Sequence, residues 1–193
     1  MKHPTPVVLA RGRVSLEPWL PGHDAELLEA AQDDDVWRWL SVPRPRDLQD
    51  IVRIRETHIG MPWAVVVDGV AAGSTSYLDI DLEVGGLEIG WTWYRRDLWA
   101  SDVNPTCKWL LLGHAFEDLG AGRVTLKTDG LNARSQAAIR KLGCEYDGTL
   151  RHHRLRADGS VRDSACFSML AAEWAAAKER LEQRLSDPLG LSG

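Results

Sequence analysis

Cysteine, phenylalanine and long apolar runs are all scarce in this sequence of 193 residues. The three cysteines, Cys107, Cys144 and Cys166, are odd in number and fall within expected helices or strands. A disulfide framework or a metal cluster is therefore not expected, and a reducing compartment suits the composition best. No apolar run reaches the ~18 residues of a membrane span, and the one near the N-terminus is too short for a signal peptide. These absences favour a cytoplasmic protein with no metal site and no membrane segment.

An excess of basic residues is also missing. Lysine and arginine number 23 against 28 aspartates and glutamates, which gives a formal net charge of −5. This balance argues against general binding to nucleic acid or anionic membranes, but it is compatible with a local basic site for a phosphorylated small molecule. The hydrophobic fraction of 44% is normal for a globular chain. We expect one domain at 13–185, an N-terminal extension at 1–12 and a C-terminal tail at 186–193.

Tryptophan, in contrast, is abundant: there are nine tryptophans and only two phenylalanines. Most tryptophans in proteins fill the core, but a concentration in one region can also wall a binding cleft. The region between residues 37 and 109 contains Trp37, Trp39, Trp91, Trp93, Trp99 and Trp109.

Hydrophobic periodicity divides the chain into alternating strands and helices, without repeats or an internal linker. The turn dipeptides Asp68-Gly69 and Asp158-Gly159 predict two hairpins. Asn104 as N-cap and Pro105 as first helical residue predict the start of an apolar helix. The order β-α-α-β-β-β-α-β-α-β-β-α predicts a mixed α/β sheet in one domain. The predicted segments are 13–19, 21–32, 48–59, 63–81, 86–94, 104–120, 123–129, 132–143, 144–155, 161–170 and 173–186.

The strand "GLEIGWTWY" (86–94) alternates between apolar and polar residues. Successive side chains of a strand point to opposite faces. We therefore expect the polar residues Glu88, Gly90, Thr92 and Tyr94 on one face, and Leu87, Ile89, Trp91 and Trp93 on the other.

The segment "LNARSQAAIRKLG" (131–143) predicts a short amphipathic helix. Asn132 is a suitable N-cap, because its side-chain oxygen can accept a hydrogen bond from the Ser135 N–H. Gly143 stands where a helix usually ends. Taken alone, these features indicate only a capped helix packed through one face, which comprises Ser135, Ala138, Ile139 and Leu142.

Five segments taken together resemble the GNAT N-acetyltransferase superfamily, and their local sequences resemble its Rim-type branch of ribosomal-protein N-terminal acetyltransferases. The resemblance extends over residues 13–185. It implies the GNAT fold, a single α/β domain with a mixed, mostly antiparallel central sheet flanked by helices. The segments are "LEIGWTWYRRDLW" (87–99), "VNPTCKWLLLGHAFEDLGAGRVTLKTD" (103–129), "NARSQAAIRKLG" (132–143), "GTLRHHRLRADGSVRDSACFSML" (148–170) and Glu173-Trp174.

The resemblance further implies an N-acyltransferase, in the first instance an N-acetyltransferase, with acetyl-CoA or another acyl-CoA as co-substrate. Asn132, Ser135 and Gly143 match the superfamily spacing of an asparagine, a small residue three positions later and a glycine eleven positions later. By this match Asn132 contacts the pantetheine arm and Ser135 lies near the thioester sulfur. The implied cofactor contacts are Trp93, Tyr94, Arg95, Trp99, Ser101, Asp102, Val103, Asn104, Asn132 and Arg134.

The phosphate-binding loop departs from the family pattern. Typical members carry Gln/Arg-x-x-Gly-x-Gly/Ala, whose bare backbone N–H groups hold the pyrophosphate. Here the loop is "WASDVN" (99–104), with Asp102 in place of the central glycine. A carboxylate ~4 Å from a phosphate charge would cost about 4 kcal/mol near a surface, unless it turns away. Basic residues that could compensate are Arg95, Arg96, Lys108, Arg134 and Lys141.

The resemblance implies catalytic roles for two residues. Glu88 matches the general base, which would take the proton of the amine through a water molecule. Ser135 is the candidate acid for the leaving thiolate, because the family's usual tyrosine is replaced by Ile139. An acid is dispensable if the thiol, with a pKa near 8.5, leaves as the thiolate. The oxyanion donor would be a main-chain N–H of 91–93.

The acceptor is a primary amine, such as a peptide N-terminus or a small-molecule amine. The last hairpin is basic, which suits an acidic peptide or a succinyl donor better than a polyamine or an aminoglycoside. Adjacent histidines on a strand face opposite ways and do not suggest a metal site. The candidate acceptor contacts are Trp37, Trp39, Trp91, His152 and Asp163.

Two alternatives remain open at this level. The degenerate "WASDVN" loop is compatible with a GNAT-fold module that binds an acyl-CoA or a partner with little catalysis. A homodimer is also possible. Stabilisation by coenzyme A would separate the enzyme from a module that no longer binds it.

Overall fold

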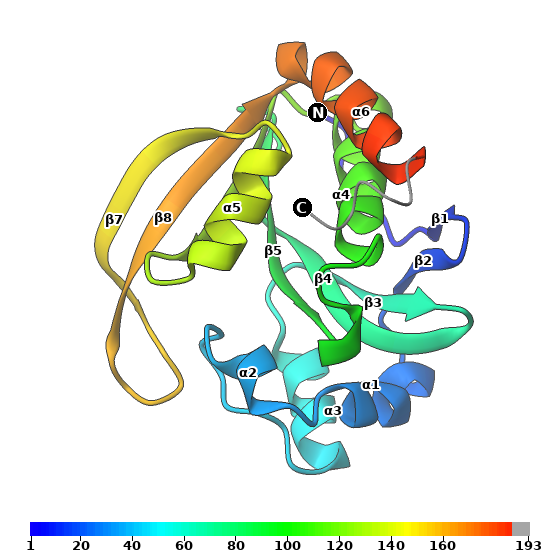
Figure 1. Ribbon diagram of the computed structural model, residues 1–193, viewed down its shortest axis with the longest axis vertical. Helices are drawn as coiled ribbons and strands as arrows, with labels where there is room; N and C mark the ends of the chain where they lie inside the picture. Colours follow the sequence, from blue (N-terminus) through cyan, green and yellow to red (C-terminus); the bar gives the residue numbers. More distant parts are fainter. Residues whose placement is uncertain (187–193) are drawn as a thin grey trace.

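An eight-stranded sheet is the centre of the computed structural model, which describes residues 1–186 (Figure 1). The strands lie in the order β1-β2-β3-β4-β5-β6-β8-β7, and only β5 and β6 form a parallel pair. The predicted α/β domain with a mixed, mostly antiparallel sheet is confirmed. The strands are β1 (Leu9–Arg11), β2 (Val14–Pro18), β3 (Met61–Val67), β4 (Val70–Asp81), β5 (Gly86–Tyr94), β6 (Arg123–Asp129), β7 (Glu145–Leu155) and β8 (Val161–Leu170).

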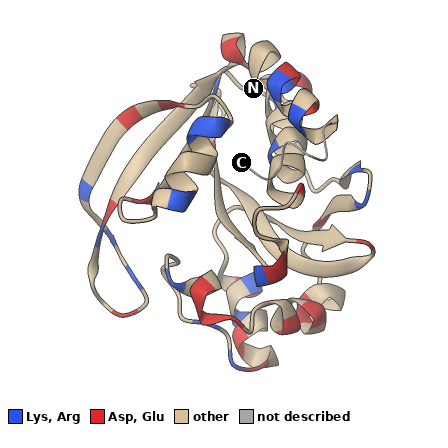
Figure 2. Cartoon of the chain, viewed as in Figure 1, with Lys and Arg blue, Asp and Glu red and all other residues tan. Residues whose placement is uncertain are grey.

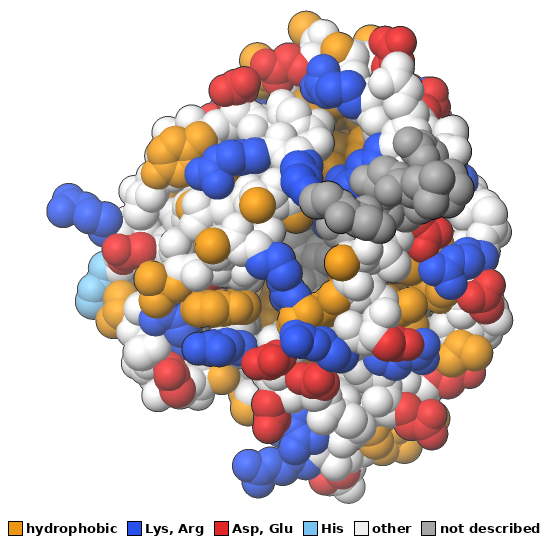
Figure 3. All heavy atoms as spheres, viewed as in Figure 1, with side chains coloured by type: hydrophobic (Ala, Val, Ile, Leu, Met, Phe, Trp, Pro, Cys, Tyr) orange, Lys and Arg blue, Asp and Glu red, His pale blue; other side chains and the backbone are white. Residues whose placement is uncertain are grey.

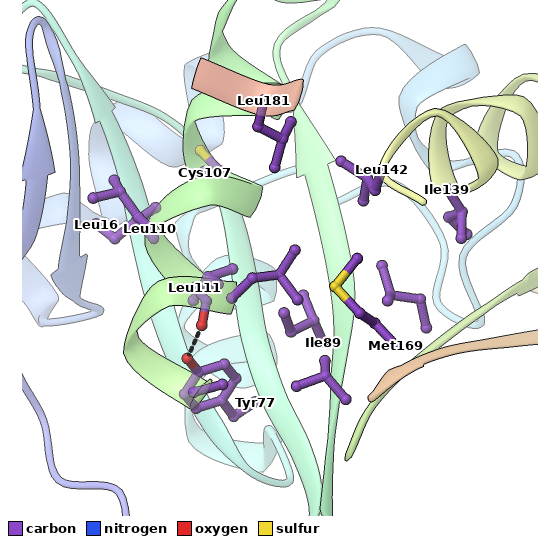
Figure 4. Close-up of a cluster of buried hydrophobic side chains, with 14 of the residues drawn as sticks. Leu16, Tyr77, Ile89, Cys107, Leu110, Leu111, Ile139, Leu142, Met169 and Leu181 are labelled. Atoms are coloured by element: carbon purple, nitrogen blue, oxygen red, sulfur yellow. Dashed lines mark hydrogen bonds between the residues drawn. The ribbon is translucent and has the colours of Figure 1, made fainter. Parts of the chain in front are cut away.

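Helices cover both faces of the sheet. Val65 of β3 belongs to the core beneath α4, α5 and α6, whereas its neighbours Ala64 and Val66 belong to the core beneath α1, α2 and α3. Figure 4 shows the first core, where the Tyr77 hydroxyl donates a hydrogen bond to the Leu111 carbonyl. The helices are α1 (Asp24–Ala30), α2 (Asp34–Trp37), α3 (Leu48–Thr57), α4 (Val103–Gly113), α5 (Ala133–Lys141) and α6 (Ala171–Ser186).

The two segments predicted to lie outside the domain differ in what the structure describes. Strand β1 falls within the N-terminal extension predicted at 1–12, and it pairs with β2. The C-terminal tail predicted at 186–193 lies outside the described residues, apart from Ser186, which ends α6.

A β-bulge interrupts the expected alternation of β5. Gly90 pairs with Ser76 and Trp93 pairs with Ser74, so that one extra residue lies on β5 between these pairs. Trp91 has a φ of 52° at this point. The bulge inserts one residue into the period of two, and Trp93 consequently packs in the core beneath α1–α3 while Tyr94 packs beneath α4. The prediction that Trp93 shares a face with Leu87 and Ile89 was therefore wrong.

Strands β5 and β6 separate soon after they meet. They are paired only at Gly86–Arg123, Leu87–Val124 and Glu88–Thr125, although both strands continue beyond these pairs. In Figure 1, α4 and α5 lie on either side of the diverging end of β5. The main-chain groups of β5 beyond Glu88 are consequently not paired with β6.

Local turn and cap predictions have mixed outcomes. Asp68 and Gly69, with φ values of 52° and 83°, form the turn between β3 and β4, and Asn132 accepts a hydrogen bond from the Ser135 N–H at 3.0 Å. Both predictions are confirmed. The N-cap prediction for Asn104 was wrong, because α4 begins at Val103. The Asn104 side chain instead accepts a hydrogen bond from the Tyr94 hydroxyl at 3.1 Å, which satisfies a buried donor.

We predict that the close contact between β4 and β5 beside the bulge makes Gly73 irreplaceable. A Cβ at Gly73 would lie 2.3 Å from the carbonyl oxygen of Trp93. Gly73→Ala should therefore lower the free energy of unfolding by about 1–3 kcal/mol in urea denaturation. Gly86→Ala is the control in β5, because its Cβ would lie 3.9 Å from the nearest atom. Equal stability of the two variants would contradict this account of the bulge.

Candidate active site

A cleft of about 460 Å³ lies where β5 and β6 separate, between the N-terminal end of α4 and helix α5. Figure 3 shows Lys and Arg side chains gathered around a hollow on this face, and Figure 2 shows acidic residues on α1 and α2. The cleft is thus a basic site on a chain of negative net charge. The predicted site residues that line it are Glu88, Trp91, Trp93, Tyr94, Trp99, Ser101, Asn104, Asn132, Arg134, Ser135 and Trp39.

Glu88 is a buried carboxylate in the wall of the cleft. Its Oε2 atom lies 2.6 Å from Lys127 Nζ, which also pairs with Asp79 at 2.9 Å. Burial raises the pKa of Glu88, and Lys127 opposes the shift. Gly90 leaves room for this carboxylate, because a Cβ there would lie 2.8 Å from Glu88 Oε1. A desolvated carboxylate with a raised pKa is suited to accept a proton near neutral pH.

Two arginines stack on Trp99 at one end of the cleft. The guanidinium carbon of Arg134, from α5, lies 3.2 Å from the ring centroid, and that of Arg96 lies 4.0 Å from it. Arg96 also lies 3.5 Å from Asp35. Burial lowers the pKa of Arg134, and the nearby charge of Arg96 lowers it further. Two like charges held together beside a cleft favour an anionic ligand.

The Asp102 carboxylate is neutralised by a residue from a distant part of the sequence. Arg13, at the turn between β1 and β2, donates to Asp102 Oδ1 at 2.7 Å and also pairs with Asp68 at 3.0 Å. This pair lowers the pKa of Asp102, and Asp102 does not line the cleft. The expected repulsion of a phosphate by Asp102 is therefore largely offset.

The N-terminal end of α4 offers few free backbone donors. The Val103 N–H is bonded to Ser101 Oγ at 3.2 Å, and Pro105 has no N–H. A pyrophosphate at this end would depend on cationic side chains more than on the bare backbone of a glycine loop.

Lys108 is a buried cation in the cleft whose role the sequence did not settle. Its Nζ atom donates to Thr92 Oγ1 at 3.0 Å, and burial lowers its pKa to about 8. The described residues include no salt-bridge partner for it. In the sequence, the only indication of a buried lysine at this position was its place inside an otherwise apolar helix.

Several other candidates lie away from the cleft lining. Trp37 packs against Trp93 with ring centroids 5.0 Å apart, so it lies behind a residue that lines the cleft. Arg95 pairs with Asp97 at 2.7 Å, and Val103 is fully buried in the core. The candidates that do not line the cleft are Trp37, Arg95, Asp102, Val103, His152 and Asp163.

His152 and Asp163 bind each other within the β7–β8 hairpin. The His152 N–H donates to Asp163 Oδ1 at 2.7 Å, and His152 has a φ of 52° where the strand register shifts. This contact stabilises an irregularity of the hairpin. The hairpin instead contributes Arg154 and Arg162 to the cleft, and β6 contributes Lys127. Strand alternation alone does not identify these residues, because their position depends on distant pairing.

Metal ligands and membrane spans are both lacking among residues 1–186. No group of three or more His, Cys, Asp or Glu side chains in this range could hold a metal ion. No helix in the described part of the chain is both long and apolar enough to cross a membrane. All three cysteines are free thiols.

Comparisons with known proteins agree with this architecture. Residues 13–145 match the model of the acetyltransferase (GNAT) domain. A structure from T. thermophilus assigned to an acetyltransferase is 34% identical, with a TM-score of 0.87 over 95% of this chain and 99% of that chain. A search of curated proteins gives no match. The chain therefore belongs to the GNAT acetyltransferase family.

Two more distant structures share the fold. A GCN5-related N-acetyltransferase from Brucella melitensis is 24% identical, with a TM-score of 0.88 over 94% of this chain and 86% of that chain. Mycobacterium smegmatis RimJ, in complex with CoA-disulfide, is 18% identical, with a TM-score of 0.78 over 92% of this chain and 94% of that chain.

We predict that Lys108 destabilises the unliganded protein in a pH-dependent way. Its folded pKa of about 8 lies below the ordinary value of 10.5. Between these two values the unfolded chain binds more protons than the folded chain, so stability should rise with pH across this window. Lys108→Met removes the buried charge and should raise the melting temperature at pH 7 by several degrees.

The difference between wild type and Lys108→Met should shrink as the pH increases from 8 to about 10.5. Melting temperatures measured across this range test it, with the exposed Lys2→Met as control. Parallel melting curves for wild type and Lys108→Met over the whole range would contradict the assignment of a desolvated lysine.

Proposed function

We propose that this GNAT-family protein is an N-acyltransferase that moves an acyl group, in the first instance acetyl, from coenzyme A to a primary amine. The observation that carries the proposal is the desolvated Glu88 carboxylate in the wall of a basic cleft, beside the unpaired end of β5. A base and an anion-binding region then lie in one cleft, which is what transfer from a phosphorylated thioester to an amine requires.

Binding of the donor is supported by the groups along the cleft. The free main-chain edge of β5 and the amide of Asn132 are suited to the pantetheine arm. Arg96 and Arg134, stacked on Trp99, are suited to the phosphates, and Lys108 adds a buried positive charge. RimJ in complex with CoA-disulfide and RimL in complex with coenzyme A are proteins of similar fold, and their complexes support the same ligand for this cleft.

The chemical step follows from the environment of Glu88. The amine nitrogen attacks the thioester carbonyl, the C–S bond breaks, and the amine proton passes to Glu88 through a water molecule. Lys127 holds the carboxylate in place at 2.6 Å, while burial keeps the pKa of Glu88 above its ordinary value and makes it a better proton acceptor. For a peptide α-amine, with a pKa of about 7.7–8.0, this base is needed most below that pH.

Different groups are the candidates for protonating the leaving thiolate and for stabilising the oxyanion. Ser135 lines the cleft from α5 and would donate a proton to the thiolate, which otherwise takes one from water. A main-chain N–H of 91–93, at the bulge, would stabilise the negative oxygen of the tetrahedral intermediate. The bulge lies at this point of β5, and residues 90–94 line the cleft.

A GNAT module with little catalysis is the alternative. Its main motivation was the carboxylate of Asp102 in the phosphate loop, and the ion pair with Arg13 offsets this objection. The enzyme is therefore favoured. Four further points stay predictions: a peptide N-terminus or small amine as acceptor, a Rim-type relationship, a cytoplasmic location and a homodimer.

We predict that Glu88→Gln lowers the turnover of acyl transfer by about 10²-fold near pH 6.5, where the amine acceptor is protonated. The loss should shrink above pH 8, because the amine then needs less help from a base. Steady-state thiol release with an N-terminal peptide panel, measured from pH 6 to 9, tests this pH profile.

Ser135→Ala and Asn132→Ala extend the same assay to α5. Ser135→Ala should lower turnover with little change in melting temperature, and Asn132→Ala should raise the Michaelis constant for the acyl donor. Thr57→Ala, a residue of α3 remote from the cleft lining, is the control. Wild-type turnover in folded Glu88→Gln and Ser135→Ala would reject the catalytic assignment of these two residues, whereas absence of turnover in the wild-type protein itself would favour the binding module.

A further inference from the structure

Two arginines oppose each other where the β7–β8 hairpin lines the cleft. Arg154 of β7 and Arg162 of β8 are direct partners in the antiparallel ladder, and both line the cleft. Directly opposed side chains of an antiparallel pair lie on the same face, where two like charges destabilise the sheet. Arg154 is exposed and Arg162 is partly buried, and an anion bound at this face would relieve their repulsion.

The neighbouring carboxylates are already committed to other cations. Asp129 binds Arg156 through two hydrogen bonds of 2.6 and 3.0 Å. Glu88 and Asp79 both pair with Lys127. Within residues 1–186, no salt bridge joins Arg154 or Arg162 to a carboxylate.

Arg162 is held in place by neutral groups only. Its Nε atom donates to Ser164 Oγ at 3.0 Å, and its Nη1 atom donates to the Trp39 carbonyl at 3.4 Å. These bonds tie β8 to the segment after α2, which forms the opposite wall of the cleft. Burial lowers the pKa of Arg162, and the charge of Arg154 lowers it further, whereas the charges of Asp129 and Glu88 raise it. The guanidinium is thus positioned and desolvated without a charged partner.

The rest of the hairpin does not share these properties. Arg156 has its own carboxylate, and Arg151 is exposed and does not line the cleft. Of the hairpin arginines that have no salt bridge within residues 1–186, Arg151 lies outside the cleft, whereas Arg154 and Arg162 line it.

We propose that Arg154 and Arg162 bind a carboxylate carried by one of the two substrates. A guanidinium binds a carboxylate through paired hydrogen bonds, which gives both affinity and orientation. The carboxylate would belong either to an acidic side chain next to the acceptor amine or to the far end of a dicarboxylic acyl group such as succinyl. The inference rests on the proposed transferase function, because it assigns the second ligand group of the same cleft.

The experiment compares matched ligands that differ in one charge. The acceptors are peptides with Asp or Asn as second residue, and the donors are succinyl-CoA and acetyl-CoA. Specificity constants from thiol release are measured for wild type, Arg162→Gln and Arg154→Gln, with Arg151→Gln as control. The wild-type enzyme should prefer one charged ligand at least about 10-fold, and which ligand it prefers identifies the source of the carboxylate.

The preference should disappear in Arg162→Gln, weaken in Arg154→Gln and persist in Arg151→Gln. Because Arg162→Gln relieves a like-charge pair, its melting temperature without ligand should equal or exceed that of wild type. A purely structural arginine would instead lower the melting temperature and leave the ligand preference unchanged. No preference for either charged ligand in wild type would overturn the proposal.

Titration calorimetry with the same ligands separates this proposal from the transferase function. If neither wild type nor any variant turns over, the proposed transferase function is rejected. The binding measurements still test whether Arg154 and Arg162 form a carboxylate site. Tighter binding of the charged ligand to wild type than to Arg162→Gln would support the carboxylate site. Equal binding of charged and neutral ligands would reject it.

Discussion

Three residue pairs join β5 to β6, and the separation of the two strands beyond Glu88 is the constraint on which the site depends. A continuous parallel ladder would fill this space with backbone hydrogen bonds. The separation instead leaves main-chain groups of β5 unpaired with β6, and a cleft lies between α4 and α5 at this point. The bulge at Trp91 acts at the same place, because it turns Thr92 toward Lys108 and Trp93 toward the opposite core.

The second organising feature is an unequal distribution of charge. The chain is acidic as a whole, yet one like-charge arginine pair stacks on Trp99 beside the cleft and another lines the cleft from the β7–β8 hairpin. Lys108 adds a buried cation between the strands and α4. Like charges held together and a buried cation cost stability in the unliganded protein, and bound anions would offset this cost. Glu88, the proposed general base, lies in the same cleft.

Local patterns were sufficient for much of the fold. The Asp68-Gly69 turn, the strand at 123–129 and the Asn132 cap each depend on residues close in sequence, and each was predicted correctly. The bulge in β5 was not predictable in this way, because an unbroken alternation of residue types conceals an inserted position. The pairing of Asp102 with Arg13 joins residues 89 positions apart. Lys127 and Arg162 reach the cleft only through strand order, so sequence spacing did not indicate them.

The central claim is that coenzyme A binds in the opening between β5 and β6, and amide chemical shifts test it most directly. Saturating coenzyme A should shift the amide signals of 90–93, of 99–104 and of 132–135, which surround the cleft. Signals from α3 (Leu48–Thr57), on the opposite face of the sheet, should stay in place. An unchanged spectrum around the cleft at saturating coenzyme A, or shifts confined to other parts of the chain, would contradict the account.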